Sequence, residues 1–164
     1  MADMDREEFD RFVEGLPAPM QVVTTATDDA RAGCLVGFAS EVSIEPPLFM
    51  VCLSDKNRTY RVALDAELLA VHLLGPDQRD LAELFGGETG DDVDKFERCS
   101  WKPGPEGVPL LDDCPRVLVG RVLERRQWGD HVAHVLEPVL VEDRGGEPGL
   151  DLTDVENLEP GHEA

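Results

Sequence analysis

A polar cluster directly follows a short apolar run in the first half of the chain. The run from Leu48 to Leu53 is unbroken, and hydroxyl, amide and cationic side chains come after it: Ser54, Lys56, Asn57, Arg58 and Thr59. Hydroxyl, ammonium and guanidinium groups are donors to phosphate oxygens, and a guanidinium can bind two of them at once. The cluster therefore predicts a phosphate site. The alternative is an ordinary polar turn in which Asn57 or Thr59 caps a short helix over 60–64.

His131 is the second residue that could do chemistry. It follows a Gly-Asp dipeptide that separates two β-type runs, 117–128 and 131–141. A two-residue connection with glycine first predicts a hairpin with a type II′ turn, because glycine readily takes a positive φ. An imidazole titrates near neutral pH and can orient a ligand or move a proton. The alternative is a surface histidine that only belongs to the turn.

No metal site is expected. His134 lies three residues beyond His131, so the two imidazoles of a strand would point to opposite faces. The four cysteines show neither a C-x-x-C pair nor zinc-ligand spacing, and Cys34 and Cys52 lie in apolar runs, where buried thiols are common. The chain also lacks a P-loop, a nucleophile elbow and the G-x-G-x-x-G fingerprint of a Rossmann domain.

Strands dominate the segments that would position these residues. Besides the hairpin, four runs are typical of strands in their β-branched or apolar content: 20–25, 35–42, 48–53 and 68–74. Helical signals are short. A capping box at Asp5 and Glu8 precedes apolar positions up to Leu16, and a second helical run over 76–84 ends at two glycines. Several strands with a few short helices predict a mainly β fold, a closed or nearly closed barrel.

The chain has 164 residues, which fits one domain with a loose end. We expect this domain over residues 1–142. Residues 143–164 are acidic and rich in glycine and proline, with few large apolar side chains. They cannot bury enough surface to offset the entropy of ordering, so they are predicted to form a disordered and dispensable tail.

The net charge is strongly negative, with 15 basic against 35 acidic side chains, or −20 at neutral pH. Such a surface repels nucleic-acid phosphates and anionic lipid, so neither a nucleic acid nor a membrane is expected as a partner. No signal peptide is recognisable in the first residues, and no apolar run approaches the roughly 20 residues that span a bilayer. We therefore expect a cytoplasmic protein.

The order of several motifs along the chain resembles the flavin reductase-like family. They are Val22-Val23-Thr24-Thr25, Ser43-Ile44-Glu45-Pro46-Pro47-Leu48, Asn57-Arg58-Thr59, Lys95-Phe96 and Gly129-Asp130-His131, and the match covers about residues 8–142. The resemblance implies an FMN-binding split barrel of Greek-key type with a few short helices, a homodimer, and FMN held near the dimer interface. It also implies that NADH or NADPH reduces the flavin, which can then feed a partner monooxygenase. Because the chain lacks a Rossmann fingerprint, this nicotinamide is expected to bind transiently in the flavin cleft.

The resemblance gives each candidate residue a role. The phosphate of FMN would be bound by the polar cluster, and His131 would lie near the nicotinamide as the catalytic residue. The flavin ring would lie on Leu35, Val36, Gly37, Phe38 and Ser40. Their backbone N–H groups would stabilise the negative charge that appears on reduction, Gly37 would admit the ring closely, and Phe38 would lie beside it.

One pair of adjacent residues departs from the family pattern. Reductases of this kind often carry a polar Asn-Ser pair where this chain has Gly37 and Phe38, so side-chain hydrogen bonds to the ring would be lost. Two functions stay open. The first is an NAD(P)H:flavin reductase that acts on FMN, or on FAD, and the second is a non-catalytic carrier or sensor that binds a flavin or a deazaflavin. His131 favours the first function, and the Gly37-Phe38 pair favours the second.

Overall fold

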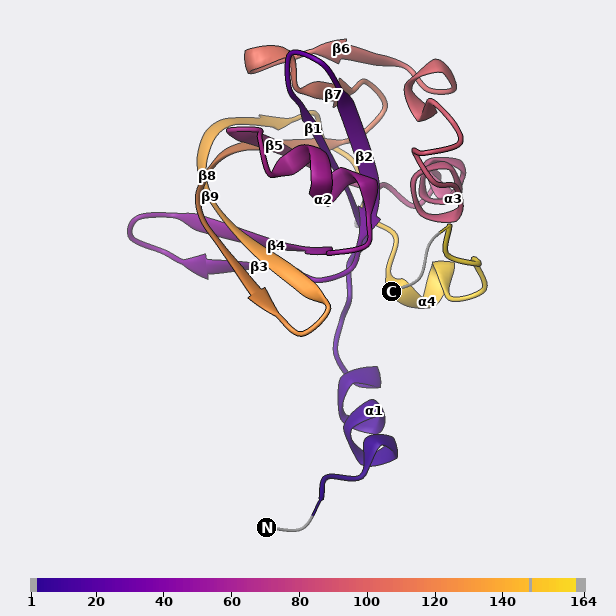
Figure 1. Cartoon of the computed structure of the whole chain (residues 1–164). Helices are drawn as coiled ribbons and strands as arrows, with labels where there is room; N and C mark the ends of the chain where they lie inside the picture. Colours follow the sequence, from indigo (N-terminus) through magenta and orange to yellow (C-terminus); the bar gives the residue numbers. More distant parts are fainter. Residues whose placement is uncertain (1–2, 148, 162–164) are drawn as a thin grey trace.

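Antiparallel strands make up most of the chain, which we describe from a computed structural model over residues 3–147 and 149–161 (Figure 1). In these residues seven strands form one sheet in the order β2-β1-β5-β8-β9-β4-β3. Their bounds are β1 Gln21–Ala26, β2 Arg31–Val36, β3 Ala39–Ser43, β4 Leu48–Ser54, β5 Leu68–Leu73, β8 Arg116–Trp128 and β9 His131–Asp143. Two short strands, β6 (Trp101–Pro103) and β7 (Pro109–Leu111), pair with each other. The mainly β architecture predicted from the sequence is confirmed.

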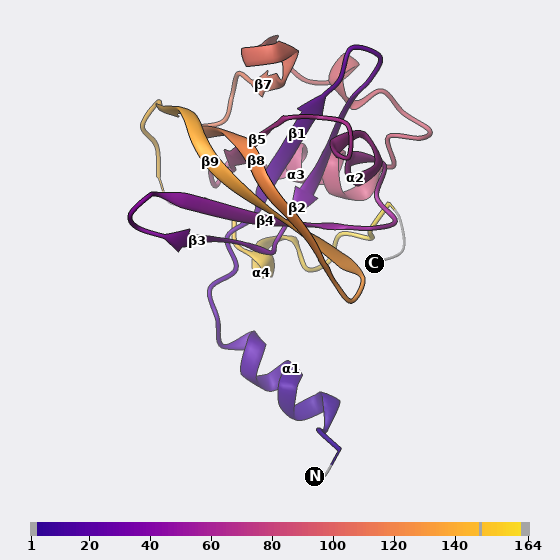
Figure 2. The same cartoon turned by 60° about the vertical axis from the view of Figure 1, so that its left-hand side comes forward.

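Short helices complete the described chain: α1 Arg6–Glu14, α2 Arg58–Ala63, α3 Arg79–Gly87, α4 Leu152–Val155, and the 3₁₀ helices η1 Lys95–Glu97 and η2 Pro105–Gly107. α1 begins after Asp5, whose carboxylate accepts a hydrogen bond from the backbone N–H of Glu7. No residue of α1 is buried, and the helix projects away from the sheet (Figures 1 and 2). The strands and α2, and not this helix, therefore position the candidate residues.

The centre of the sheet is buried on both faces. Alternate residues of a strand point to opposite faces, so Val22 of β1 belongs to the core that contains Phe85, and Val23 belongs to the core that contains Leu136. α3 and β7 contribute to the first core, and the second core fills the inside of the curved sheet. β8 and β9 pair along 13 residues each with two register shifts, and such irregularities bend a pair of strands.

The predicted single strand over 35–42 is wrong, because the structure has two strands there. β2 pairs with β1, whereas β3 pairs with β4. Only Gly37 and Phe38 lie between them, and the carbonyl of Phe38 accepts a hydrogen bond from the backbone N–H of Cys52 at 2.9 Å. The residues from Leu35 to Ala39 are all apolar, so the sequence gives no sign that the hydrogen-bonding partner changes within them. Since β2 and β3 are the two edges of the sheet, this short link nearly closes it.

Residues 149–161 pack against the sheet, which differs from the disordered tail expected over 143–164. Leu150 and Val155 are buried in the same core as the inner face of α3. Leu150 also makes backbone hydrogen bonds to two other segments, at 2.9 and 3.1 Å. The segment has few apolar residues, but these backbone hydrogen bonds add to their burial and order it. Residues 148 and 162–164 of the expected tail lie outside the described residues.

Candidate functional site

The first residue of β9 lies opposite the last residue of β4. In the antiparallel register of these strands His131 pairs with Ser54, and the backbone N–H of Asp55 donates to the carbonyl of Asp130 at 3.0 Å. Gly129 has a φ of +64°, as a type II′ turn requires at its first position. The predicted hairpin is confirmed, and it places the candidate histidine beside the start of the polar cluster.

Phe38 lies against His131, with the ring centroids 4.9 Å apart at an interplanar angle of 57°. It is 62% exposed and follows Gly37 in the link between β2 and β3. His131 Nδ1 lies 2.7 Å from Asp130 Oδ1, and this hydrogen bond lowers the pKa of the Asp130 carboxyl. An ionised carboxylate can only accept, so Nδ1 carries the proton and Nε2 is left as the acceptor.

The other residues predicted to hold the flavin ring lie in different environments. Val36 is buried in the inner core, and Leu35 packs against α3 at Gly86. Ser40 is exposed, and its hydroxyl donates to the carbonyl of Glu41 at 2.9 Å. The side chains of these three residues therefore make other contacts within the protein. Leu35 and Val36 could contact a flavin ring only through their backbone groups. β2 is an edge strand, so about half of its backbone N–H groups are not used by the ladder with β1.

The polar cluster begins α2. Asn57 is the N-cap residue, and its side-chain oxygen accepts a hydrogen bond from the backbone N–H of Thr59 at 2.9 Å. Thr59 is buried, and its hydroxyl forms a hydrogen bond with the thiol of Cys34. Ser54 is also buried and accepts a hydrogen bond from the backbone N–H of Lys56 at 3.4 Å. The helix cap is therefore confirmed, and part of the donor set predicted for a phosphate is used within the protein.

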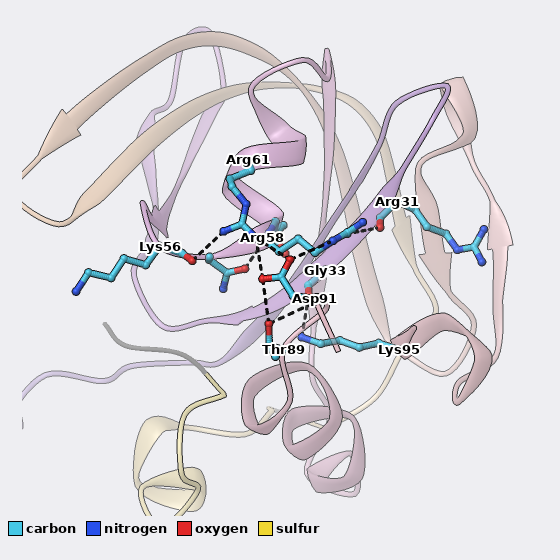
Figure 3. Close-up of polar contacts among 10 residues, drawn as sticks. Arg31, Gly33, Lys56, Arg58, Arg61, Thr89, Asp91 and Lys95 are labelled. Carbon is cyan, nitrogen blue, oxygen red and sulfur yellow. Dashed lines mark hydrogen bonds and ion pairs between the residues drawn. The ribbon is translucent and has the colours of Figure 1, made fainter. Parts of the chain in front are cut away.

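Two arginines of α2 converge on a carboxylate from the loop after α3 (Figure 3). Arg61 donates two hydrogen bonds to Asp91, at 2.8 and 2.7 Å, and Arg58 Nε lies 3.8 Å from the same carboxylate. Arg58 also donates to the carbonyl of Arg31 at 3.0 Å. The hydrogen bonds from Arg61 lower the pKa of Asp91. At neutral pH an anion of the chain itself therefore lies at the cations of the cluster.

Two residues of this arginine–carboxylate cluster, Arg61 and Asp91, are not predicted from the sequence. Arg61 lies three positions after Arg58, which is the spacing of neighbours on one helix face, and this signal could have identified it. Asp91 carries no such signal, because it lies 30 positions from Arg61 in a loop. Its contact with α2 follows only from the fold.

Lys95 is a buried cation. Its Nζ donates to the carbonyls of Gly33 and Phe85, at 3.1 and 2.9 Å, and so ties β2 to α3 (Figure 3). Burial lowers its pKa. Two of the three donors of the ammonium are used in this way, which assigns Lys95 to holding the β2 edge in place.

The buried histidines lie apart from the Phe38–His131 pair. His72 Nδ1 lies 3.0 Å from the carbonyl of Val22, and its Nε2 accepts a hydrogen bond from the backbone N–H of Leu111 at 3.0 Å. His134 lies three residues after His131 in β9 and is fully buried, as expected for the opposite face of the strand. Burial lowers the pKa of both His72 and His134 to about 4.

The described part of the chain contains neither a cluster of metal ligands nor a membrane-spanning helix. Within residues 3–147 and 149–161, no three His, Cys, Asp or Glu side chains are placed to hold a metal ion. In the same part of the chain, no helix combines the length and the apolar character needed to cross a membrane.

Known proteins share both the sequence pattern and the fold. The model of the Flavin reductase like domain matches residues 13–155. The chain is 28% identical over 150 residues to FMN reductase (NADH) RutF of Pseudomonas syringae, covering 92% of this chain and 84% of that protein. It is 28% identical over 135 residues to the 4-hydroxyphenylacetate 3-monooxygenase reductase component of Salmonella typhimurium, covering 82% of this chain and 79% of that protein.

A solved structure shares the architecture. The NADH:FAD oxidoreductase SgcE6 of Streptomyces globisporus C-1027 superimposes with a TM-score of 0.76 at 23% identity, covering 87% of each chain. The family match includes the whole sheet, α2 and the β8–β9 hairpin, and it also extends over most of the C-terminal segment. The chain belongs to the family of the Flavin reductase like domain and has the split-barrel fold of that family.

Proposed function

We propose that the chain binds FMN and transfers hydride to it from NADH or NADPH. Bound FMN would supply the ring that accepts the hydride. One observation carries the proposal: His131 lies opposite Ser54 and against Phe38, so that ring candidates and phosphate candidates share one surface. Support also comes from membership of the family and from the relative that is named an NADH-dependent FMN reductase.

The residues around α2 fit a phosphate. Arg58, Arg61 and the exposed Lys56 provide cationic donors, and Ser54 adds a hydroxyl. Charge-assisted hydrogen bonds from a guanidinium are roughly twice as strong as neutral ones. When a phosphate binds, the carboxylate of Asp91 would have to give up hydrogen bonds or share the two arginines with it, because Arg61 now donates two hydrogen bonds to Asp91.

The edge of β2 and the link that follows it fit a flavin ring. An edge strand has backbone N–H groups that point away from the sheet, and such donors stabilise negative charge on the ring. Gly37 has no side chain to hold the ring away, and Phe38 offers a flat apolar surface beside it. In this chain the backbone would therefore make the hydrogen bonds that an Asn-Ser pair makes elsewhere in the family.

His131 is the proposed catalytic residue. Asp130 fixes the proton on Nδ1, so Nε2 can accept a hydrogen bond from the nicotinamide amide or take up a proton. Phe38 packs on the imidazole and limits its rotation. The residue would thus orient the hydride donor and move a proton at Nε2.

We also propose that the protein is a homodimer. The outer face of β4 and β9 carries the half-buried Met50 and Val135, and the exposed Trp128 lies at its end, opposite His131. A second copy that covers this apolar face would also reach His131. Light scattering at micromolar concentration, with FMN present, should give the mass of a dimer, and the mass of a monomer would contradict this part of the proposal.

A partner monooxygenase would use the reduced flavin. The relative from Salmonella typhimurium is itself the reductase component of a monooxygenase. We expect this exchange to take place in the cytoplasm. Activity of a two-component mixture, dependent on the reductase and on a nicotinamide, is the assay for such a partner.

A non-catalytic flavin or deazaflavin carrier is the second candidate function. Two observations favour it. Phe38 replaces a polar ring contact and packs on His131, and Asp91 already engages the arginines of α2. A carrier would bind its ligand through the backbone and need no imidazole at the nicotinamide.

Anaerobic stopped flow separates the two functions. FMN-loaded protein is mixed with NADH or NADPH, and the absorbance of oxidised flavin is followed, with free FMN as the control. We expect the absorbance to fall with at least one nicotinamide and faster than in the control. Bound flavin that neither nicotinamide reduces would favour the carrier, and a protein that binds no flavin would refute both functions.

A further inference from the structure

The helix α1 carries an apolar face that no described part of its own chain covers. Spacings of three and four residues place Phe9, Phe12 and Val13 on one side of the helix, and their exposed fractions are 44%, 69% and 38%. An isolated helix of nine residues is only marginally stable in water, so this face needs a partner. The helix projects away from the sheet, so the partner does not come from the sheet of the same chain (Figures 1 and 2).

The link between α1 and β1 keeps the helix in this projecting position. Pro17 and Pro19 favour an extended backbone in the link. The link is also fixed to the C-terminal segment. The backbone N–H of Ala18 donates to the carboxylate of Asp151 at 2.9 Å, and the carbonyl of Ala18 accepts from the N–H of Leu152 at 2.8 Å. A stiff and anchored link disfavours folding of α1 back onto its own sheet, so the expected partner is another molecule.

A groove of about 240 Å³ lies on the outer face of the β8–β9 hairpin, and its walls are formed by Glu124, Arg126, Trp128, Ala133 and Val135. Trp128 is 59% exposed. An exposed aromatic ring beside small apolar side chains is typical of an anchor site in a protein interface. The turn of the hairpin and α1 lie at the same end of the molecule (Figures 1 and 2). Two copies that face each other with this end can therefore each offer α1 to the groove of the other.

The helix and the groove carry complementary charges. Arg126 is exposed and makes no ion pair with any described residue. Glu8 lies four positions before Phe12, on the flank of the apolar face, and also lacks an ionic partner in the described chain. Two copies of a chain with a net charge of −20 repel each other, so local attraction at their contact favours one arrangement over others. A pair of Glu8 and Arg126 would supply this attraction.

We propose that α1 is an exchanged arm, and that in the homodimer the arm of each copy docks in the β8–β9 groove of the other. The inference rests on the proposed homodimer and names the segment and the surface that hold it together. Phe9 and Phe12 would cover Trp128, and Glu8 would pair with Arg126. Trp128 lies opposite His131 in the register of the hairpin, so the arm of one copy would border the ring end of the proposed flavin site in the other.

Sedimentation equilibrium of the whole chain, with and without FMN, tests the proposal through the dissociation constant of the dimer. The double variant Phe9→Ser/Phe12→Ser should raise this constant about hundredfold, because aromatic anchors contribute most of the binding free energy of an interface. Neither side chain is buried within its own chain, so the circular dichroism spectrum should not change. Leu152→Ser removes an apolar side chain that is 49% exposed outside the arm, and it is the matched control.

An exchange of charges tests where the arm docks. Arg126→Glu should raise the dissociation constant about fivefold, as expected for the loss of an ion pair at the rim of an interface, and Glu8→Arg should have a similar effect. The double variant Glu8→Arg/Arg126→Glu should restore a constant close to that of the wild type. Arg11→Glu is the control, because it reverses one charge on the opposite side of α1 and should leave the dimer unchanged.

The outcomes separate the arm from the homodimer and from the flavin. A wild type that is monomeric with and without FMN would overturn both the arm and the homodimer. A dimer that the phenylalanine variant leaves unchanged would overturn the arm alone. Failure of the double charge variant to recover the dimer would overturn the docking of α1 in this groove. The measurement without FMN does not depend on flavin, so a protein that dimerises through α1 and binds no flavin would support the arm and refute the proposed reductase.

Discussion

Arg61 holds the carboxylate of Asp91 with two hydrogen bonds, at 2.8 and 2.7 Å, on the helix where the family resemblance places the phosphate of FMN. Two negative groups would therefore compete for one pair of cations. Each would weaken the binding of the other, because a guanidinium fork accommodates one carboxylate or one phosphate in bidentate fashion.

Removal of the charge at Asp91 should strengthen phosphate binding. Asp91→Asn keeps the size of the side chain and removes the negative charge, so we expect the affinity for FMN to rise several-fold and the affinity for riboflavin to stay the same. Titration of flavin fluorescence measures both affinities. Asp92→Asn is the matched control, since Asp92 is a neighbouring exposed carboxylate for which the structure gives no ion pair with a described residue. A loss of FMN binding in Asp91→Asn would mean that Asp91 positions the arginines.

Arg58→Ala should weaken the binding of FMN more than the binding of riboflavin. A hydrogen bond to a charged group contributes about 1.5–3 kcal/mol, so a loss of roughly tenfold to hundredfold is expected for FMN alone. Arg121→Ala removes an exposed arginine of β8 that pairs with Glu67, outside the polar cluster, and serves as the control. Equal losses for both ligands would show that Arg58 acts through its hydrogen bond to the carbonyl of Arg31.

His131→Ala should slow flavin reduction and leave the affinity for FMN nearly unchanged. A general acid or base contributes on the order of 10²–10⁴-fold, and an orienting group contributes less, so we expect a fall of about tenfold or more. Stopped flow gives the reduction rate, and calorimetry gives the affinity. His131→Gln retains a hydrogen-bonding group and should recover part of the rate if orientation is the role. An unchanged rate in His131→Ala would leave this histidine as a residue of the turn.

Leu150→Ala should destabilise the protein. Leu150 is buried in the core and is bonded through its backbone to two other segments, and the loss of a buried leucine side chain costs about 2–5 kcal/mol. Leu152→Ala is the matched control, because Leu152 is about half exposed on α4. Urea unfolding compares the two variants. Similar free energies of unfolding for both variants and the wild type would support a dispensable C-terminal segment.

Stability should fall on mild acidification. Burial lowers the pKa of His72 and of His134 from 6.5 to about 4 in the folded protein. Between these values the unfolded chain binds protons that the folded chain does not, so the free energy of unfolding decreases as the pH falls from 6.5 toward 4. Above pH 6.5 these two groups should add no slope. Urea titrations at a series of pH values test this, and His134→Gln should flatten the curve. The same free energy of unfolding at pH 7 and pH 5 would contradict the prediction.

Local signals in the sequence predict the hairpin and the start of α2. Gly129 has no side chain that opposes a positive φ, and Asn57 has the short polar side chain of an N-cap, so in both places the residue type determines the backbone. Most strands of the sheet are predicted from their apolar residues, because a strand with a buried face must have apolar side chains on that face. The polar cluster and His131 therefore lie near each other because of elements that the sequence does predict.

Contacts between distant segments are not predictable in this way. The stretch over 35–42 is apolar up to Ala39, and nothing in this pattern shows that the chain stops pairing with β1 and begins to pair with β4 at Phe38. Asp91 reaches Arg61 because the fold brings the loop after α3 to α2. Leu150 is one of three leucines in an acidic segment, and the local composition does not show that its backbone bonds to other segments and that its side chain is buried.

The link of Gly37 and Phe38 has a consequence for aggregation. It makes the two edge strands consecutive in the chain, but within the described residues β2 and β3 each have only one neighbouring strand. The remaining unpaired N–H groups of β2 are those proposed to face the flavin ring. An edge that is open to a ring is also open to the backbone of another chain. Bound flavin would therefore act as a cap on that edge, and the flavin-free protein would be the form that pairs with its neighbours.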